Sequence, residues 1–233
     1  DQPRSRGLGD VYKRQLVNRK INVSSFKCGP DYIDPMFHKT VIGTAAYNLD
    51  TYLMSNDTVN YLLNKNSGDI AVIEGVMGFY DGFSFTEKGS THELSEITDT
   101  DVILVVNCRG MSLSAMALVK GFKEFRKNNI KGVIFNNLSG KLYGDLSEEC
   151  RKIGLVPLGF LPNIKDVQIS SRHLGLVTAG EIDGIKDKMN LLADYAEKYI
   201  DIDKILEISE NDRDTKFTSL EITKKYNVKI AVA

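Results

Sequence analysis

The feature that most constrains the fold of this 233-residue chain is the alternation of short apolar runs with helical patterns. Apolar runs of strand length, bounded by polar or turn residues, predict buried parallel strands. They lie at residues 21–26, 70–73, 102–106 and 133–135, with a fifth candidate at 155–161. Helical patterns separate them at residues 58–63, 113–125, 146–153 and 189–200. The alternation predicts right-handed βαβ units, and therefore an α/β fold with a mostly parallel sheet and helices on both faces.

Composition excludes several classes of protein. The formal net charge of -1 gives no basic field for nucleic acid, and no apolar run reaches the roughly 18 residues that span a bilayer. The beginning of the chain also lacks the basic and apolar pattern of a signal peptide. Cys28, Cys108 and Cys150 are scattered without metal-binding spacing, and the three histidines are equally dispersed. We therefore expect reduced thiols in a cytoplasmic protein without a zinc site.

Polar residues follow the predicted strands at the ends where parallel sheets bind ligands. Lys27, Asp31 and Asp34 follow the first strand, and Glu74 ends the second. Asn107 ends the third strand and Asn136 the fourth. The sequence thus predicts that these groups converge on one edge.

The loop after the first strand places one cation and two carboxylates between residues 27 and 34. Pro30 and Pro35 remove backbone donors, and Asp34, which precedes a proline, is biased toward extended geometry. This arrangement favours a site for phosphate and metal, although Asp, Gly and Pro are also ordinary turn residues. Tyr32 could stack on an aromatic ligand or simply cover the loop, and His38 could face substrate or pack.

Glu74 follows four apolar residues, and a carboxylate at the tip of a buried strand is costly unless it is paired or metal-bound. Together with Asp31 or Asp34 it could hold Mg²⁺, while Lys27 neutralises a transferred phosphoryl group. The alternative is that Glu74 caps the next turn. Asp81 lies in a Tyr-Asp-Gly sequence that is also a common turn.

The remaining candidates have weaker patterns. Asn107 and Asn136 could read a nucleotide base or orient a carboxylate, but Asn at a strand end is often a turn residue. Arg172 and His173 stand in a late loop and could reach a polyanion, while His173 could equally form a structural hydrogen bond.

Three motifs resemble those of the cobyrinic acid a,c-diamide synthases. They are GPDYIDP at residues 29–35, EGVMGFYDG at 74–82 and SRHLGL at 171–176. The resemblance extends from about residue 16 to the end. It implies a dethiobiotin-synthetase-like P-loop fold, followed in the family by a glutamine amidotransferase domain.

The resemblance also implies an ATP- and Mg²⁺-dependent amidation in cobalamin biosynthesis, with glutamine or ammonia as nitrogen donor. In that reading, the carboxylates for metal binding, phosphoryl transfer and handling of the intermediate are Asp31, Asp34, Glu74 and Asp81. Tyr32 and Ile33 would border the substrate. Family members often self-associate, which makes a homodimer possible.

Both ends of the chain depart from the family pattern. The Gly-rich phosphate loop that ends in Gly-Lys-Thr is missing, so residues 1–15 resemble foreign sequence, such as a translated library adapter. We expect a synthetase domain at 16–200 without its first strand and phosphate loop. Residues 201–227 would form a linker, and 228–233 would begin a lost amidotransferase domain. We therefore expect this chain to be inactive with ATP and glutamine.

Three alternatives stay open at this point. A sibling enzyme could amidate nickel-sirohydrochlorin or hydrogenobyrinate, because the motifs do not distinguish these tetrapyrroles. A partitioning-type nucleotide-switch ATPase is more distant, because its second strand would normally end in Asp and it has no GPDYIDP loop. A remnant that only binds tetrapyrrole is the third.

Overall fold

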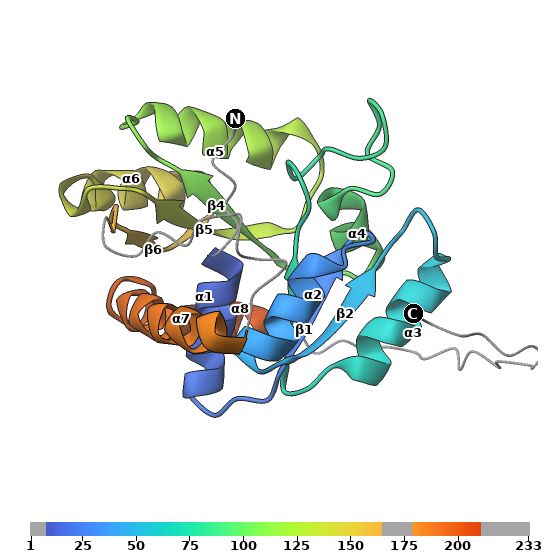
Figure 1. Ribbon diagram of the computed structural model, residues 1–233. Helices are drawn as coiled ribbons and strands as arrows, with labels where there is room; N and C mark the ends of the chain where they lie inside the picture. Colours follow the sequence, from blue (N-terminus) through green and yellow to red (C-terminus); the bar gives the residue numbers. More distant parts are fainter. Residues whose placement is uncertain (1–7, 165–178, 211–233) are drawn as a thin grey trace, which may run out of the picture.

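The computed structural model describes residues 8–164 and 179–210 (Figure 1). Its helical elements are α1 (Leu8–Asn18), α2 (Ile33–Phe37), the π-helix η1 (His38–Ile42), α3 (Asn56–Asn66), α4 (Thr91–Ile97), α5 (Ser114–Phe125), α6 (Gly140–Lys152), α7 (Ala179–Tyr199) and α8 (Ile202–Ser209). Its strands are β1 (Val23–Cys28), β2 (Ala45–Leu49), β3 (Ile70–Glu74), β4 (Val102–Asn107), β5 (Ile130–Asn136) and β6 (Val156–Leu161). The predicted α/β class is confirmed. Among the described residues, no helix is both long and apolar enough to cross a membrane.

The strands form two three-stranded sheets, whereas the sequence predicted one. The first sheet has the order β2-β1-β3 and the second the order β4-β5-β6, and all pairs are parallel. In the described part of the chain no strand bridges the facing edges of β3 and β4, which is the physical reason for the split. Periodicity identifies strands but does not say which of them pair.

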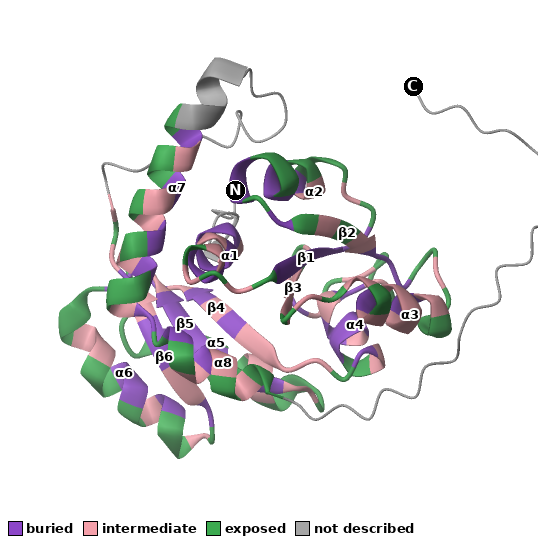
Figure 2. Cartoon of the chain, turned by 90° about the horizontal axis from the view of Figure 1, so that it is seen from below, coloured by how far each residue is buried: buried purple, intermediate pink, exposed green. Residues whose placement is uncertain are grey.

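Helices cover both faces of the first sheet (Figure 2). On one face, Phe26 and Leu49 pack with Val59 and Leu63 of α3 and with Leu94 of α4. The other face meets the large core cluster that contains residues of α1, η1 and α7. The α3 helix begins at a Ser55 cap whose side chain accepts from the Thr58 amide, as its sequence favours.

The second sheet is covered in the same way. Val133 and Phe135 pack with Met116 and Val119 of α5 and with residues of α6. Ile134 points to the opposite face, where it joins the cluster built by α1, α7 and α8. The alternation of side chains along β5 therefore buries apolar residues on both faces, as a central parallel strand requires.

Five predicted strands are confirmed, with boundaries shifted by a few residues. The sequence analysis missed β2 at the edge of the first sheet, whose first four residues alternate between exposed and half-buried before the buried Leu49 and so form no apolar run. It also missed α8, which lies in the predicted linker and buries Ile202 and Ile205. Charged residues on the exposed face of α8 hide its short apolar stripe.

The α1 helix occupies part of the segment expected to be foreign. Val11, Tyr12 and Leu16 are buried, and Lys13 is fully buried. The helix packs against α7, β1 and η1. Packing does not reveal where a sequence came from, so the foreign origin of residues 1–15 stays a prediction.

Candidate functional site

The pairing of β1 with β3 places Lys27 directly beside Glu74 at the carboxyl ends of the two strands. Lys27 is 4% exposed. Its Nζ lies 2.8 Å from Asp34 Oδ2 and 3.3 Å from Glu74 Oε1, and it donates to the Gly75 carbonyl at 3.1 Å. One buried ammonium therefore joins the loop after β1 to the end of β3.

The loop after β1 turns into the short helix α2 at Ile33, and Asp31 lies two residues before this helix. Asp31 Oδ1 accepts from the amides of Ile33 at 2.8 Å and Asp34 at 3.2 Å. The turn is also fixed from β2, because Asn48 donates to the Asp31 carbonyl at 2.6 Å. The Asp31 side chain thus closes a local turn just ahead of α2, whose N-cap is Tyr32, and this turn leads into Asp34, which pairs with Lys27.

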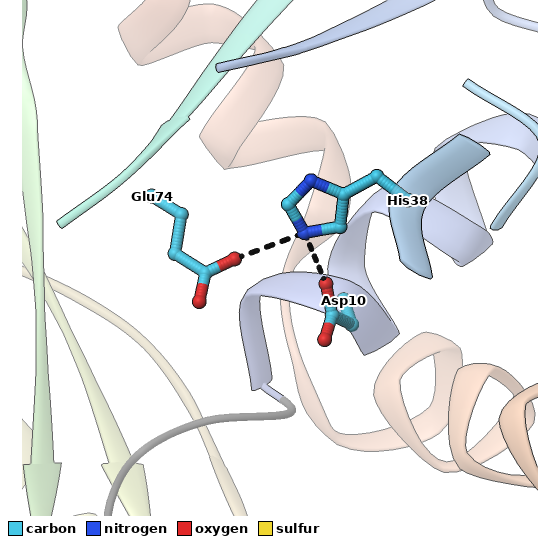
Figure 3. Close-up of side chains that lie close together, drawn as sticks. All are labelled: Asp10, His38 and Glu74. Carbon is cyan, nitrogen blue, oxygen red and sulfur yellow. Dashed lines mark ion pairs between the residues drawn. The ribbon is translucent and has the colours of Figure 1, made fainter. Parts of the chain in front are cut away.

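The second oxygen of Glu74 meets two further groups, Lys13 and His38, and His38 in turn contacts Asp10 (Figure 3). Glu74 Oε2 lies 2.8 Å from Lys13 Nζ and 3.2 Å from His38 Nε2. His38 Nε2 also lies 2.8 Å from Asp10 Oδ1 and from Lys13 Nζ. We call these six side chains, Asp10, Lys13, Lys27, Asp34, His38 and Glu74, the charged cluster.

The pKa shifts within the charged cluster follow from its burial and pairing. Burial alone would raise the pKa of Glu74, but the His38 contact and the charges of Lys13 and Lys27 hold it well below its usual value. Burial would lower the pKa of Lys27, yet the charges of Glu74 and Asp34 leave it raised. His38 likewise has a raised pKa, because its contacts with Asp10 and Glu74 outweigh burial. Glu74 is thus held as a carboxylate.

The charged cluster includes three groups that could ligate a metal, namely Asp10, His38 and Glu74. The predicted second carboxylate, Asp31, is not in this group of three. Lys13 Nζ lies within 2.8 Å of both His38 and Glu74 and 3.6 Å from Asp10. Its ammonium therefore occupies the position that a metal ion bound by these three groups would take. As arranged here, these residues do not fit Mg²⁺.

The Tyr-Asp-Gly sequence after β3 forms an exposed turn. The Gly78 amide donates to Asp81 Oδ2 at 3.1 Å, and the Asp81 amide donates to the Gly78 carbonyl at 3.0 Å. An added Cβ at Gly78 would lie 2.3 Å from Asp81 Oδ2, so a side chain there would displace this carboxylate from the turn. Tyr80 anchors the turn, since its hydroxyl donates to the Phe122 carbonyl at 2.6 Å. The catalytic role expected for Asp81 stays a prediction.

Asn107 and Asn136 lie side by side at the ends of β4 and β5. Asn107 Oδ1 accepts from Asn137 Nδ2 at 2.9 Å and from the Arg109 amide at 3.3 Å. Asn136 Oδ1 accepts from the amide of Asn137 at 3.0 Å. Both amides are thus engaged in turns of the second sheet, and their nucleotide-binding role stays a prediction.

The predicted substrate-binding residues have different positions. Tyr32 is 79% and Ile33 is 44% exposed, so both are accessible beside the charged cluster. His38 is 1% exposed and lies behind Glu74, where it contacts a carboxylate instead of the surface. Arg172 and His173 lie outside the described residues.

Sequence reasoning missed Lys13 and Asp10, because the segment that carries them matches no motif and was expected to be foreign. The spacing of three between Asp10 and Lys13 would have placed both on one helical face. No signal linked that face to Glu74. The contacts among Lys27, Asp34, His38 and Glu74 involve none of the residues 1–15.

Comparisons with known proteins agree with the motifs. A protein-family model described as an AAA domain matches residues 30–171, which is more than half of the chain. The cobyrinate a,c-diamide synthase of Sulfolobus acidocaldarius is 41% identical over 198 residues. The Methanocaldococcus jannaschii enzyme of the same name is 40% identical over 207 residues, and that of Thermoplasma volcanium is 40% identical over 224.

The matches cover most of this chain but only part of each relative. They span 84%, 85% and 94% of this chain, and 45%, 46% and 49% of the three relatives. The chain therefore spans about half the length of the curated relatives it matches.

Among solved structures, the MinD cell division protein of Aquifex aeolicus aligns with a TM-score of 0.48 and 13% identity, covering 82% of this chain and 89% of that one. That structural likeness is too weak to separate classes of protein. On the family model and the sequence identities, the chain belongs to the AAA domain family and is a homologue of the cobyrinate a,c-diamide synthases.

Proposed function

We propose that this chain is the synthetase part of a cytoplasmic enzyme that amidates the a and c carboxylates of cobyrinic acid, using ATP and ammonia or glutamine. The observation that carries the proposal is the buried Lys27, held between Asp34 of the GPDYIDP loop and Glu74 of the EGVMGFYDG motif. Asp34 and Glu74, which stand 40 positions apart in the sequence (74 − 34), thus meet through one ion-pair network. Such a network at the carboxyl ends of parallel strands is where this class of fold binds its ligands.

The carboxylate must be phosphorylated before amidation, because a carboxylate is a poor electrophile. A carboxylate oxygen of the corrinoid attacks the γ-phosphorus of ATP, the bond from that phosphorus to the bridging oxygen breaks, and ADP leaves. Ammonia then attacks the carbonyl carbon of the acyl phosphate. Phosphate leaves with the electron pair of the C–O bond, and a proton is lost to give the amide.

In this proposal the first role of the ion pair between Lys27 and Glu74 is to position the groups of the site. Lys27 holds the Asp34 and Glu74 carboxylates in fixed orientation, and its charge lies where phosphoryl oxygens would accumulate negative charge. The family relationship implies Mg²⁺ as well. In this chain the ammonium of Lys13 stands in that place beside Glu74, so we derive no step through a metal.

We further propose that the parent protein contributes a strand and phosphate loop ahead of residue 16. The half-burial of β3 along its whole length supports this, because its apolar sequence is typical of a strand buried on both sides. A strand between β3 and β4 would join the two sheets. A glutamine amidotransferase domain and self-association into a homodimer complete the proposal for the parent.

The test uses a chimera in which residues 1–15 are replaced by the corresponding segment of the Methanocaldococcus jannaschii relative. The replacement also removes Lys13. We expect the chimera to convert cobyrinic acid to its diamide with ATP, Mg²⁺ and ammonium chloride, measured by mass spectrometry, and the present chain to form none. Glu74→Gln in the chimera should abolish both amidations, whereas Glu149→Gln on the exposed face of α6 should leave them unchanged.

A folded chimera that forms no amide would contradict the proposal, and so would normal turnover by its Glu74→Gln variant. The same assay with hydrogenobyrinate and nickel-sirohydrochlorin decides among the tetrapyrroles. A higher kcat/KM for one of these would transfer the assignment to the sibling enzyme.

A further inference from the structure

A loop beyond the charged cluster presents large apolar side chains to solvent. Phe83 is 62% exposed and Phe85 is fully exposed, and both lie on residues 82–89 between the Tyr-Asp-Gly turn and α4. Tyr52 and Leu53, just after β2, are 49% and 69% exposed. The rings of Phe83 and Tyr52 lie 5.2 Å apart, so the two segments form one surface. We call Tyr52, Leu53, Phe83 and Phe85 the aromatic wall.

The exposed rings stand on an ordered backbone. The Gly82 amide donates to the Thr86 carbonyl at 3.0 Å, and the Phe83 amide donates to the Lys88 carbonyl at 2.7 Å. The Thr86 hydroxyl closes the turn by donating to the Phe83 carbonyl at 2.6 Å. A side chain at position 82 would collide with the Lys88 carbonyl, 2.3 Å from an added Cβ. The loop therefore holds its aromatic residues in solvent by its own bonds.

Both ends of this loop are tied to the edge that carries the charged cluster. Its first residue directly follows Asp81, and its last, Gly89, lies against the end of β1, with Cys28 Sγ 3.9 Å from the Gly89 carbonyl. The Gly89 amide also donates to Glu93 Oε2 at 2.6 Å, and the same carboxylate accepts from Thr51. In Figure 1 the loop is the green-teal coil that projects ahead of α4.

The other half of the aromatic wall is fixed as well. Asp50 follows β2, and its Oδ1 accepts from the amides of Tyr52 at 2.8 Å and Leu53 at 3.2 Å. Lys88 Nζ lies 5.3 Å from the centroid of the Tyr52 ring, which places a positive charge on the wall. The surface thus combines flat aromatic rings with a cation, next to the carboxylates of the charged cluster.

We propose that the aromatic wall binds the flat face of a carboxylated tetrapyrrole, with Lys88 pairing to one of its peripheral carboxylates. This inference rests on the proposed function and deepens it, because it assigns the residues that select a macrocycle as substrate. Contiguous exposed apolar residues mark binding surfaces, and aromatic rings contact a planar ring with little loss of conformational freedom. A tetrapyrrole with ionised carboxylates has the matching shape and charge.

The test is a titration of the purified 233-residue chain with dicyanocobyrinic acid, followed by absorbance and calorimetry without ATP. We expect Phe83→Ala/Phe85→Ala to weaken binding by about two- to tenfold for each ring removed, since an aromatic contact contributes about 0.5–1.5 kcal/mol beyond area burial. Lys88→Met should weaken binding by a smaller factor. This difference from the unchanged chain should shrink when salt is added. The matched control is Leu118→Ala, which removes an exposed apolar side chain of α5. Circular dichroism checks that all variants fold.

The outcomes separate the inference from the proposed function. No binding of dicyanocobyrinic acid by the unchanged chain would overturn the proposed substrate, and the aromatic wall with it. Binding that is equally strong in the unchanged chain and in Phe83→Ala/Phe85→Ala would overturn the aromatic wall alone. If that variant changes only the sedimentation behaviour of the chain, the surface joins two copies of this chain instead, and the inference is wrong.

Discussion

The two sheets have the same local design but use their carboxyl ends differently. In the first sheet, the groups at the ends of β1 and β3 contact side chains from α1, α2 and η1. In the second sheet, Asn107 and Asn136 engage Asn137 and backbone amides of their own turns. Polar residues at strand ends are therefore not evidence of a site by themselves. The difference lies in whether they connect separate elements.

The facing edges of the two sheets add a second contrast. Every residue of β3 is half-buried, and β4 alternates between half-buried and buried, although both sequences are almost continuously apolar. By comparison, β1 is buried throughout and β5 is largely buried. The interior strands of each sheet are thus better covered than the strands that face one another.

The largest expected effect concerns the ends of the two sheets. Lys27→Met leaves Asp34 and Glu74 without their shared buried cation, so we expect the free energy of unfolding to fall by about 3–5 kcal/mol. Asn107→Ala in the second sheet removes hydrogen bonds of a turn and should cost about 1 kcal/mol. Urea unfolding of both variants checks the comparison. Equal losses would mean that the two sheet ends are energetically alike.

Five of the described strands could be predicted because each is an apolar run bounded by polar residues, whereas β2 is not such a run. The approach of Lys27, Asp34 and Glu74 follows from parallel pairing of their strands. The division into two sheets could not, since it depends on what lies between β3 and β4. The sequence also could not predict that His38 lies next to Glu74. Its position depends on η1, whose five-residue hydrogen-bond spacing the sequence does not signal.

A smaller effect is expected when the ammonium beside Glu74 is removed. Lys13→Met leaves Asp10, His38 and Glu74 as three potential ligands, a nitrogen and two carboxylates that suit Co²⁺ or Zn²⁺. We expect this variant to bind Co²⁺ and to gain about 2.7 kcal/mol of stability when free metal is a hundredfold above Kd.

Calorimetry and the visible absorbance of Co²⁺ measure this binding. Lys120→Met, which removes an exposed lysine of α5, is the control and should bind no more Co²⁺ than the unchanged chain. Among the described residues, the second sheet carries no comparable group of potential metal ligands, so we expect no Co²⁺ site there. Equal Co²⁺ affinity in the unchanged chain and in Lys13→Met would show that the ammonium does not occupy the cation's place.

The smallest effect concerns the ion pairs that link the end of α1 to α7 and α8. Arg19, directly after α1, lies 2.5 Å from Glu197 Oε1 of α7 and from Asp203 Oδ1 of α8. The Arg19 contact lowers the pKa of Glu197. A depressed carboxyl pKa stabilises the fold above the unfolded value of about 4.3, and this contribution is lost as pH falls through the folded pKa.

Arg19→Gln should therefore cost at most about 1 kcal/mol at pH 7 and low salt, because a partly exposed pair is screened by solvent. The difference from the unchanged chain should shrink in high salt and at pH 3, as urea unfolding would measure. A loss that persists under both conditions would mean that Arg19 stabilises the fold through packing or uncharged hydrogen bonds and not through its ion pairs. The α1 and α7 helices also share apolar packing, because Val11 and Leu16 lie in the same buried cluster as Met189 and Ala196. Apolar packing between α1 and α7 should hold the two sheets together when the surface charges are neutralised, since hydrophobic burial does not depend on ion pairing.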